Sequence, residues 1–375
     1  MFQPFIFKLD HNEFDISDNN LITSTNINIP LISLGYHYFF NRTKNAMSIT
    51  KNLPNKFYNI VNPFEITIQN YDDSITNLTK HYINKTISSK TFYKIWEILF
   101  SFNIAEDENL NYAVIADESD VIVDTVKNYR HKLGDKKMKD TDYTLSKHTK
   151  ELTLKQINKD LEKIKKIELL IADCTLKWSD DNFQEQEGYK LIIGQIIVAL
   201  KSESKNFVLK FFESFTMPTI KLIYILSNCY EETYIYKPFF SKITNSERYV
   251  VCKKFKKSKL LKSLESVFDK MNTDKFIFDF FPDLVIPPNF LNKFKIINIK
   301  ISNPQQIMCN EIVKYIKENN YFGEKYHTFR DKQIEATKWW VSNYFPPSSN
   351  LYEKNKEEIH KQLKSTEEKN NLIQI

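Results

Sequence analysis

Apolar and polar positions between residues 91 and 257 follow two alternating patterns. Short continuous apolar runs are typical of strands buried on both faces of a sheet, and they alternate with stretches whose helical periodicity predicts amphipathic helices. Strands joined by helices of this length predict an α/β, Rossmann-like and mostly parallel sheet, and the loop between the last two strands predicts an antiparallel edge strand. The expected strands are the start of 111–119 and the runs 167–173, 206–212, 232–236 and 247–255; the expected helices are 91–103, 185–201 and 219–230.

The flanking regions do not continue this alternation. The first 85 residues mix short apolar runs with Asn- and Asp-rich breaks, which predicts short strands and helices. After residue 257 the pattern predicts helices, and the polar end of the chain predicts a frayed helix or disorder. We therefore divide the chain into an N-terminal extension (1–85), an α/β domain (86–257), a C-terminal, mainly helical region (258–350) and a charged tail (351–375).

Composition narrows the class of protein. Of the 375 residues, 42% are hydrophobic and 14% are aromatic, which is enough to bury an ordinary core. The four cysteines are scattered without a C-x-x-C pair, so we expect reduced thiols, with neither a disulfide framework nor a metal site. The sequence lacks an apolar run of about 18 residues and a signal-peptide pattern, so we expect a cytoplasmic protein with no membrane contact.

Four segments place charged side chains on the expected elements, in a recognisable order. They are SSKTFYKIWEIL (88–99), IADCTLKWSDDNFQEQ (171–186), NFVLKFF (206–212) and KPFFSKITNSERYVVCKKFK (237–256). Each motif alone is weak, but together they resemble the FtsJ-like RNA ribose 2′-O-methyltransferases, in the branch found in large cytoplasmic DNA viruses. The resemblance implies the methyltransferase fold, and it assigns the catalytic roles to Lys94, Asp173, Lys210 and Glu247.

This set of side chains suits methylation of a ribose 2′-hydroxyl, which must lose its proton near neutral pH. A cationic amine stabilises the developing alkoxide, and carboxylates orient that amine at the edge where open α/β sheets bind ligands. Taken singly, Lys94 could be a solvated helix position, Asp173 a helix cap and Glu247 an ordinary edge charge. Lys210 is harder to explain in this way, because a lysine inside an apolar strand is costly unless it is paired or reaches an open site.

The segment that should hold S-adenosylmethionine departs from the family pattern. The family has a Gly-rich turn after its first strand, where backbone amides approach the methionine part of the cofactor. Here Asp117 stands at the acidic position, and Ser119, Asp120 and Val121 stand where the family has Pro-Gly-Gly. The next two strands should fall within 127–166, which is charged almost throughout and predicts at most one helix. We therefore expect the cofactor to bind in an unusual manner or not at all.

A lysine-rich run follows the last predicted strand. The net charge of +6 favours anionic partners only mildly. Beside an RNA-binding edge, however, such a run predicts contacts to the RNA backbone, although a lysine run is more often a solvated surface. The candidate RNA-binding residues are Lys242, where the family pattern has Arg, and Lys253, Lys254, Lys256 and Lys257.

Two functions remain open at this point. The resemblance implies an S-adenosylmethionine-dependent RNA (nucleoside-2′-O-)-methyltransferase acting on capped mRNA, and the four charged residues favour it. The eroded turn favours a catalytically silent relative that serves as an RNA-binding subunit of a virion or of a capping or transcription complex. Both interpretations place the protein in the host cytoplasm or the virion, and both require RNA as a partner.

Overall fold

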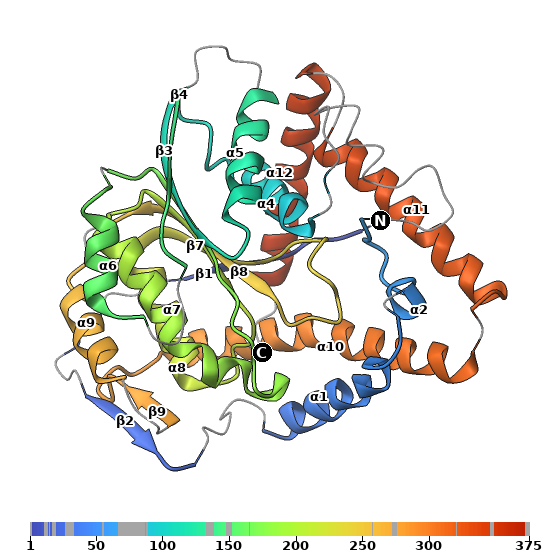
Figure 1. The fold of residues 1–375 in the computed structure, drawn as a ribbon, viewed down its shortest axis with the longest axis horizontal. Coiled ribbons are helices and arrows are strands. Elements are labelled where there is room, and N and C mark those ends of the chain that lie inside the picture. The colour runs from blue at the N-terminus through green and yellow to red at the C-terminus, as the bar shows by residue number, and fades with distance from the viewer. Residues whose placement is uncertain are drawn as a thin grey trace.

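A seven-stranded mixed sheet forms the centre of the chain (Figure 1). Its strand order is β1-β7-β8-β6-β5-β3-β4; β3 to β6 run parallel, and β8 lies antiparallel between β6 and β7. The predicted Rossmann-like, mostly parallel sheet is confirmed, as is the antiparallel pairing of its last two strands. The antiparallel strand at the edge, however, is β1 of the N-terminal extension, which pairs with β7. The strands are β1 (Phe5–Leu9), β3 (Asn109–Ala116), β4 (Lys139–Thr144), β5 (Leu169–Asp173), β6 (Asn206–Phe211), β7 (Tyr230–Lys237) and β8 (Arg248–Phe255).

The structure is a computed structural model. It describes residues 2–10, 14, 16, 20–26, 34–54, 56–66, 87, 89–132, 139–147, 152–164, 166–256, 258–271, 276–319, 321–345 and 349–371.

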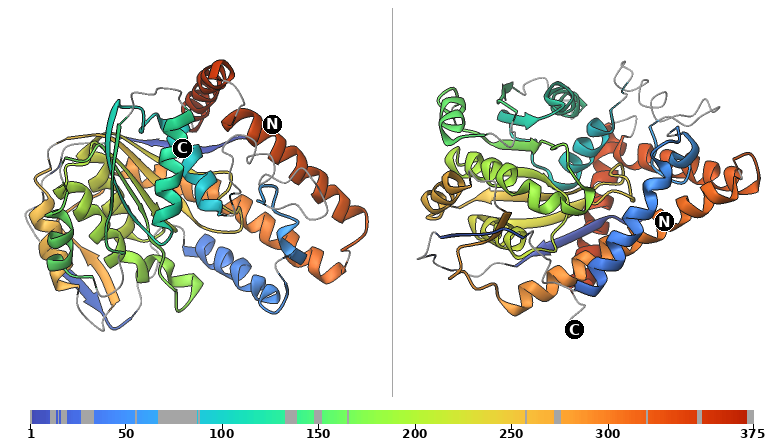
Figure 2. Two further views of the ribbon diagram at one scale, coloured as in Figure 1. Left: turned by 45° about the horizontal axis from the view of Figure 1, so that its top comes forward. Right: turned by 60° about the horizontal axis from the view of Figure 1, so that its bottom comes forward.

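Helices cover both faces of the sheet and form two hydrophobic cores (Figure 2). Along β5, Leu170 and Ala172 belong to one core, while Leu169 and Ile171 belong to the other. This alternation explains why the strand is apolar throughout, because both of its faces are buried. The first core takes in α6 (Leu154–Leu161), α7 (Gln184–Lys201), α8 (Met217–Cys229), α9 (Leu261–Lys270) and α10 (Pro288–Glu318); the second takes in α4 (Lys90–Phe102), α5 (Ser119–Lys132), α11 (Glu324–Tyr344) and α12 (Ser349–Asn371).

Helix α4 was expected to be amphipathic, but it is buried along nearly its whole length. Ser89 caps its first turn by accepting a hydrogen bond from the Thr91 amide, and Asn103 ends it in a left-handed conformation with φ of 52°. α11 and α12 pack against α4 on the side that would otherwise face solvent. Lys94, near the start of α4, is only 8% exposed. A solvated position is therefore excluded for this lysine.

The charged stretch 127–166 contains one strand that the sequence did not predict. β4 pairs in parallel with β3, yet its side chains are mostly exposed, so it carries no apolar signal. The buried Arg130 holds this edge by donating to the Asp140 carboxylate and to the carbonyl oxygens of Ala105 and Asp107. Within the described residues of this stretch there is one strand, where the family arrangement implies two.

The N-terminal extension and the C-terminal region add structure beyond the predicted helices. β2 (Leu21–Ser24) pairs with β9 (Phe276–Phe280), a strand inside the region expected to be helical. The expected frayed or disordered tail is instead α12, which packs against α4 and β1 with Tyr352, Ile359 and Leu363 buried. The extension also contributes α1 (Leu34–Ala46), the short helix η1 (Met47–Thr50) and α2 (Lys56–Asn59). Among the described helices, none combines the length and apolarity needed to cross a membrane.

Candidate active site

Lys94, Asp173, Lys210 and Glu247, called the transfer residues below, meet at the carboxyl edge of the parallel strands. They line a cleft of about 540 Å³, the transfer cleft, whose wall also includes Thr175. β5 and β6 end here side by side, so their register brings Asp173 next to Lys210. The structure thus brings together the four residues that the sequence singled out, at the edge where open α/β sheets bind ligands.

Lys210 is held by three acceptors. Its Nζ donates to the Asp173 carboxylate, to the Asp173 carbonyl oxygen at 3.1 Å and to Thr175 Oγ1 at 2.6 Å. These contacts offset the cost of burying the ammonium group, which is only 7% exposed. The ammonium is therefore fixed at the floor of the cleft.

Lys94 forms the second ion pair of the site. Its Nζ lies 2.6 Å from Glu247 Oε1, which joins α4 to the residue that precedes β8. Burial alone would raise the pKa of Glu247, but the Lys94 and Lys210 charges outweigh it and lower that pKa to about 2. Burial alone would lower the pKa of Lys94, but the Glu247 and Asp173 charges raise it. Both groups therefore stay charged at neutral pH.

Tyr249, which the sequence analysis missed, joins the two ion pairs. Its hydroxyl lies 2.8 Å from Asp173 Oδ2 and 3.0 Å from Glu247 Oε1. Burial, reinforced by the two carboxylate charges, raises the pKa of Tyr249 well above its usual value, so the hydroxyl keeps its proton. The available signal was its position two residues after Glu247, because residues two apart in an extended segment share a face.

We expect Tyr249→Phe to fold but to be less stable by about 1–3 kcal/mol, because the two buried carboxylates lose the single hydroxyl proton that they share. The measurement is the free energy of unfolding in denaturant, compared with Tyr38→Phe as a control. Tyr38 is 63% exposed, so its hydroxyl should contribute little. Equal effects of the two substitutions would contradict a bridging role for Tyr249.

The turn after β3 forms no open cradle for S-adenosylmethionine. α5 begins directly at Ser119, whose hydroxyl donates to the Ala116 carbonyl oxygen at 3.0 Å, and Asp120 lies in its first turn. The Asp117 carboxylate is paired with Lys147 and accepts from the Thr175 amide at 2.6 Å. Asp117 is thus already engaged, and Asp120 would place a negative charge where the family binds the cofactor's carboxylate. These residues do not fit the cofactor in the family's manner.

The lysines at and after the end of β8 lie at the opposite end of the strands from the transfer residues. β8 runs antiparallel to β6, so Tyr249 pairs with Lys210, while Lys253 pairs with Asn206 at the start of β6. At about 3.3 Å per residue, four residues along a strand span about 13 Å. The expectation that this lysine run lies beside the transfer residues is therefore wrong, because it did not account for the direction of the strand.

The other candidate RNA-binding lysines do not all lie at the same end of the strands. Lys254 lies 3.3 Å from the carboxylate of Glu231, and the Lys256 amide bonds back to the end of α8. Lys257 lies outside the described residues. Lys242, in the loop before β8, does lie at the transfer edge, where its Nζ donates to Asn59 Oδ1 at 3.0 Å. Of the five candidates, Lys242 keeps the expected position.

Comparison with known proteins agrees with the fold and the site. Residues 90–255 match the family model described as FtsJ-like methyltransferase. The cap-specific mRNA (nucleoside-2′-O-)-methyltransferase 1 of Caenorhabditis elegans is 29% identical over 188 residues, which cover 46% of this chain and 20% of that protein. An inactive cap-specific mRNA (nucleoside-2′-O-)-methyltransferase 1B of Caenorhabditis briggsae is 26% identical over 188 residues, 46% of this chain and 22% of that protein.

An uncharacterized protein of Acanthamoeba polyphaga mimivirus is similar over a longer stretch, with 26% identity over 338 residues, 76% of this chain and 42% of that protein. The chain thus spans about a fifth of the C. elegans relative and under half of the viral one. Residues 90–255 are an FtsJ-like methyltransferase domain, as the sequence motifs indicated. This domain is related to cap-specific mRNA 2′-O-methyltransferases at modest identity.

Proposed function

We propose that this protein is an S-adenosylmethionine-dependent RNA ribose 2′-O-methyltransferase that acts on capped mRNA. The observation that carries the proposal is the continuous chain of contacts from Lys94 through Glu247, Tyr249 and Asp173 to Lys210. Burying this many charges is costly, and shifted pKa values in a cleft, here those of Lys94, Glu247 and Tyr249, are typical of functional sites. The relatives that are named as cap-specific methyltransferases support capped mRNA as the substrate.

Each transfer residue has a defined part in this reaction. When RNA binds, the Lys210 ammonium exchanges its hydrogen bond to Thr175 Oγ1 for one to the ribose 2′-hydroxyl. It then stabilises the negative charge that develops as the hydroxyl loses its proton to water. Asp173 orients Lys210, and Glu247 orients Lys94. The Lys94 ammonium adds a second positive charge to the cleft. Tyr249 keeps the two carboxylates in a fixed relation, so the ammonium groups are positioned before RNA binds.

A second candidate function follows from the turn at Ser119 and Asp120. A silent relative would bind RNA across the same cleft as a subunit of a virion or of a capping or transcription complex. The engagement of Asp117 by Lys147 favours this reading, and one relative is itself named inactive. The two functions differ in one measurable property, the transfer of a methyl group.

Titration with S-adenosylmethionine in a calorimeter tests the donor site. We expect weak binding, with a dissociation constant well above the low-micromolar range, because the turn offers side chains in place of glycines. Low-micromolar binding corresponds to a binding free energy of about −8 kcal/mol. The double variant Asp120→Gly with Val121→Gly should bind at least tenfold more tightly. Low-micromolar binding by the parent protein would contradict the misfit of the turn.

Methyl transfer to a short capped RNA should then be measured at millimolar donor. Detectable transfer supports the enzyme, and its absence in both the parent and the double-glycine variant would favour the silent RNA-binding subunit.

A further inference from the structure

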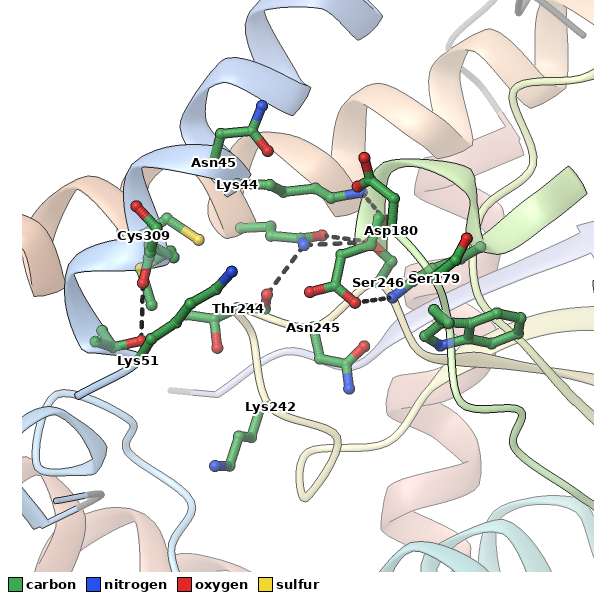
Figure 3. Close-up of a pocket in the computed structure, with 17 residues that line it drawn as sticks. Lys44, Asn45, Lys51, Ser179, Asp180, Lys242, Thr244, Asn245, Ser246 and Cys309 are labelled. Atoms are coloured by element: carbon green, nitrogen blue, oxygen red, sulfur yellow. Dashed lines mark hydrogen bonds between the residues drawn. The ribbon is translucent and has the colours of Figure 1, made fainter. Parts of the chain in front are cut away.

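A second and larger cavity opens beside the transfer cleft (Figure 3). Its volume is about 940 Å³, at the upper end of the range of about 300–1,000 Å³ for ligand pockets. Trp178, Asp181, Gln184 and Asn245 line both the cavity and the cleft. A polymer held in the cleft can therefore continue directly into this space, which we call the extension cavity.

Segments outside the family match contribute eight of the seventeen residues that line the extension cavity. α1 and η1 of the N-terminal extension line one part of it, and Gln305 and Cys309 of α10 line another. The loops 178–184 and 242–246, which belong to the methyltransferase domain, complete it. The cavity thus lies where the two extensions meet the methyltransferase domain, next to the transfer cleft.

Buried contacts hold these loops in place. Lys44 of α1 donates to the Asp181 carbonyl oxygen at 2.7 Å and to Glu213 Oε1 at 2.6 Å, and Ser246 donates to the same carboxylate at 3.0 Å. Burial alone would raise the pKa of Glu213, but the Lys44 charge outweighs it and lowers that pKa to about 2. Gln305 of α10 donates to the Thr244 carbonyl oxygen at 3.0 Å. The wall is therefore formed before any ligand arrives.

The charges of the cavity differ from one side to another. Lys51 and Lys242 reach it from two different segments, and within the described part of the chain neither forms an ion pair with a carboxylate. Lys44, in contrast, is neutralised by Glu213. Asp180 and Asp181 add two carboxylates to the lining, close in the chain to Trp178, whose indole also lines the cavity. Phosphate suits the two lysines, while a base that carries N–H donors suits the indole and carboxylate side.

We propose that the extension cavity binds the nucleotide adjacent to the one whose ribose lies at Lys210. Its phosphate lies against Lys51 and Lys242, and its base stacks on Trp178 with a donor edge toward Asp180. The ligand is a single-stranded RNA segment, because a paired base cannot present its edge and its face in this way. This inference rests on the proposed function only in placing RNA in the transfer cleft, and it holds with or without methyl transfer.

The test is fluorescence anisotropy with a labelled single-stranded RNA of about ten nucleotides and the full chain. We expect the double variant Lys51→Glu with Lys242→Glu to bind at least tenfold more weakly than the parent. The slope of log affinity against log salt should flatten by about 1.4, since each lost phosphate contact accounts for about 0.7 on single strands. The matched control is Lys253→Glu with Lys254→Glu, which makes the same charge change at the far edge and should bind within about twofold of the parent.

Thermal unfolding of both variants shows whether either substitution disturbs the fold. An unchanged affinity of the cavity variant, or an equal loss in the control, would overturn the inference. If the cavity variant binds RNA as tightly as the parent and still transfers methyl groups, this inference is wrong and the proposed function is still supported. Weakened RNA binding without methyl transfer in the parent would support the cavity and count against the enzyme.

Discussion

Lys210→Ala is expected to lower methyl transfer to RNA by at least 100-fold while leaving RNA affinity nearly unchanged. The ammonium's proposed work is done on the alkoxide that develops in the transition state, so its removal should reduce turnover more than binding. A group that assists proton loss typically contributes about 100- to 10,000-fold. The measurements are transfer of labelled methyl to a capped RNA and anisotropy with the same RNA.

Lys205→Ala is the matched control, because Lys205 immediately precedes the same strand at its opposite end and is exposed. It should leave both transfer and RNA binding close to the parent values. If Lys210→Ala retained full transfer, the assignment of the central lysine would fail. If it lost RNA binding and transfer by the same factor, Lys210 would be an RNA-anchoring residue and not a group that acts in the transition state.

In the parent protein, Glu97 is expected to lower the free energy of unfolding by about 3 kcal/mol as the pH rises from 4.5 to 7. Glu97→Gln is expected to remove this fall. Glu97 is fully buried one turn after Lys94, and it accepts hydrogen bonds from Tyr236 at 2.6 Å, Trp340 at 2.9 Å and the Phe239 amide at 3.1 Å. It therefore ties the loop that leads to Glu247, and helix α11, to α4. Burial outweighs these donors and raises the pKa of Glu97 to about 7.

The sign follows from the proton that each state binds. Between pH 4.5 and 7 the folded protein keeps the Glu97 proton while the unfolded chain has lost it, so the free energy of unfolding falls as pH rises. Below pH 4.5 both states are protonated, and above pH 7 both are ionised, so this contribution is flat. A shift from 4.5 to about 7, at about 1.4 kcal/mol per unit, gives the expected fall of about 3 kcal/mol.

Denaturant unfolding of the parent and of Glu97→Gln at several pH values isolates this contribution, because the other titrating groups are common to both proteins. Glu357→Gln, at an exposed position of α12, is the control and should follow the parent at every pH. Parallel pH curves for the parent and Glu97→Gln would show that Glu97 is ionised in the folded state throughout this range.

The sequence by itself determined the interior of the sheet and singled out the four residues that meet in the transfer cleft. β5 and β6 are buried on both faces, so their apolar runs are continuous and their ends can be located by inspection. A charged residue stands out against such a run, which is why Lys210 was difficult to explain as an ordinary core position. Four motifs in one order then identified the family of the domain.

Only the tertiary structure decided what lies around that interior. β4 is an exposed edge strand, which has no apolar face to bury and therefore leaves no hydrophobic signal. The position of Lys253 depended on the direction of β8, and an antiparallel pairing with β6 moved it to the far edge of the sheet. Tyr249 bridges two carboxylates that are 74 residues apart in the chain (173 and 247), and the extension cavity joins α1 to α10. Such contacts arise from packing between distant segments, whereas the period of a sequence pattern reports only which face of each local element is buried.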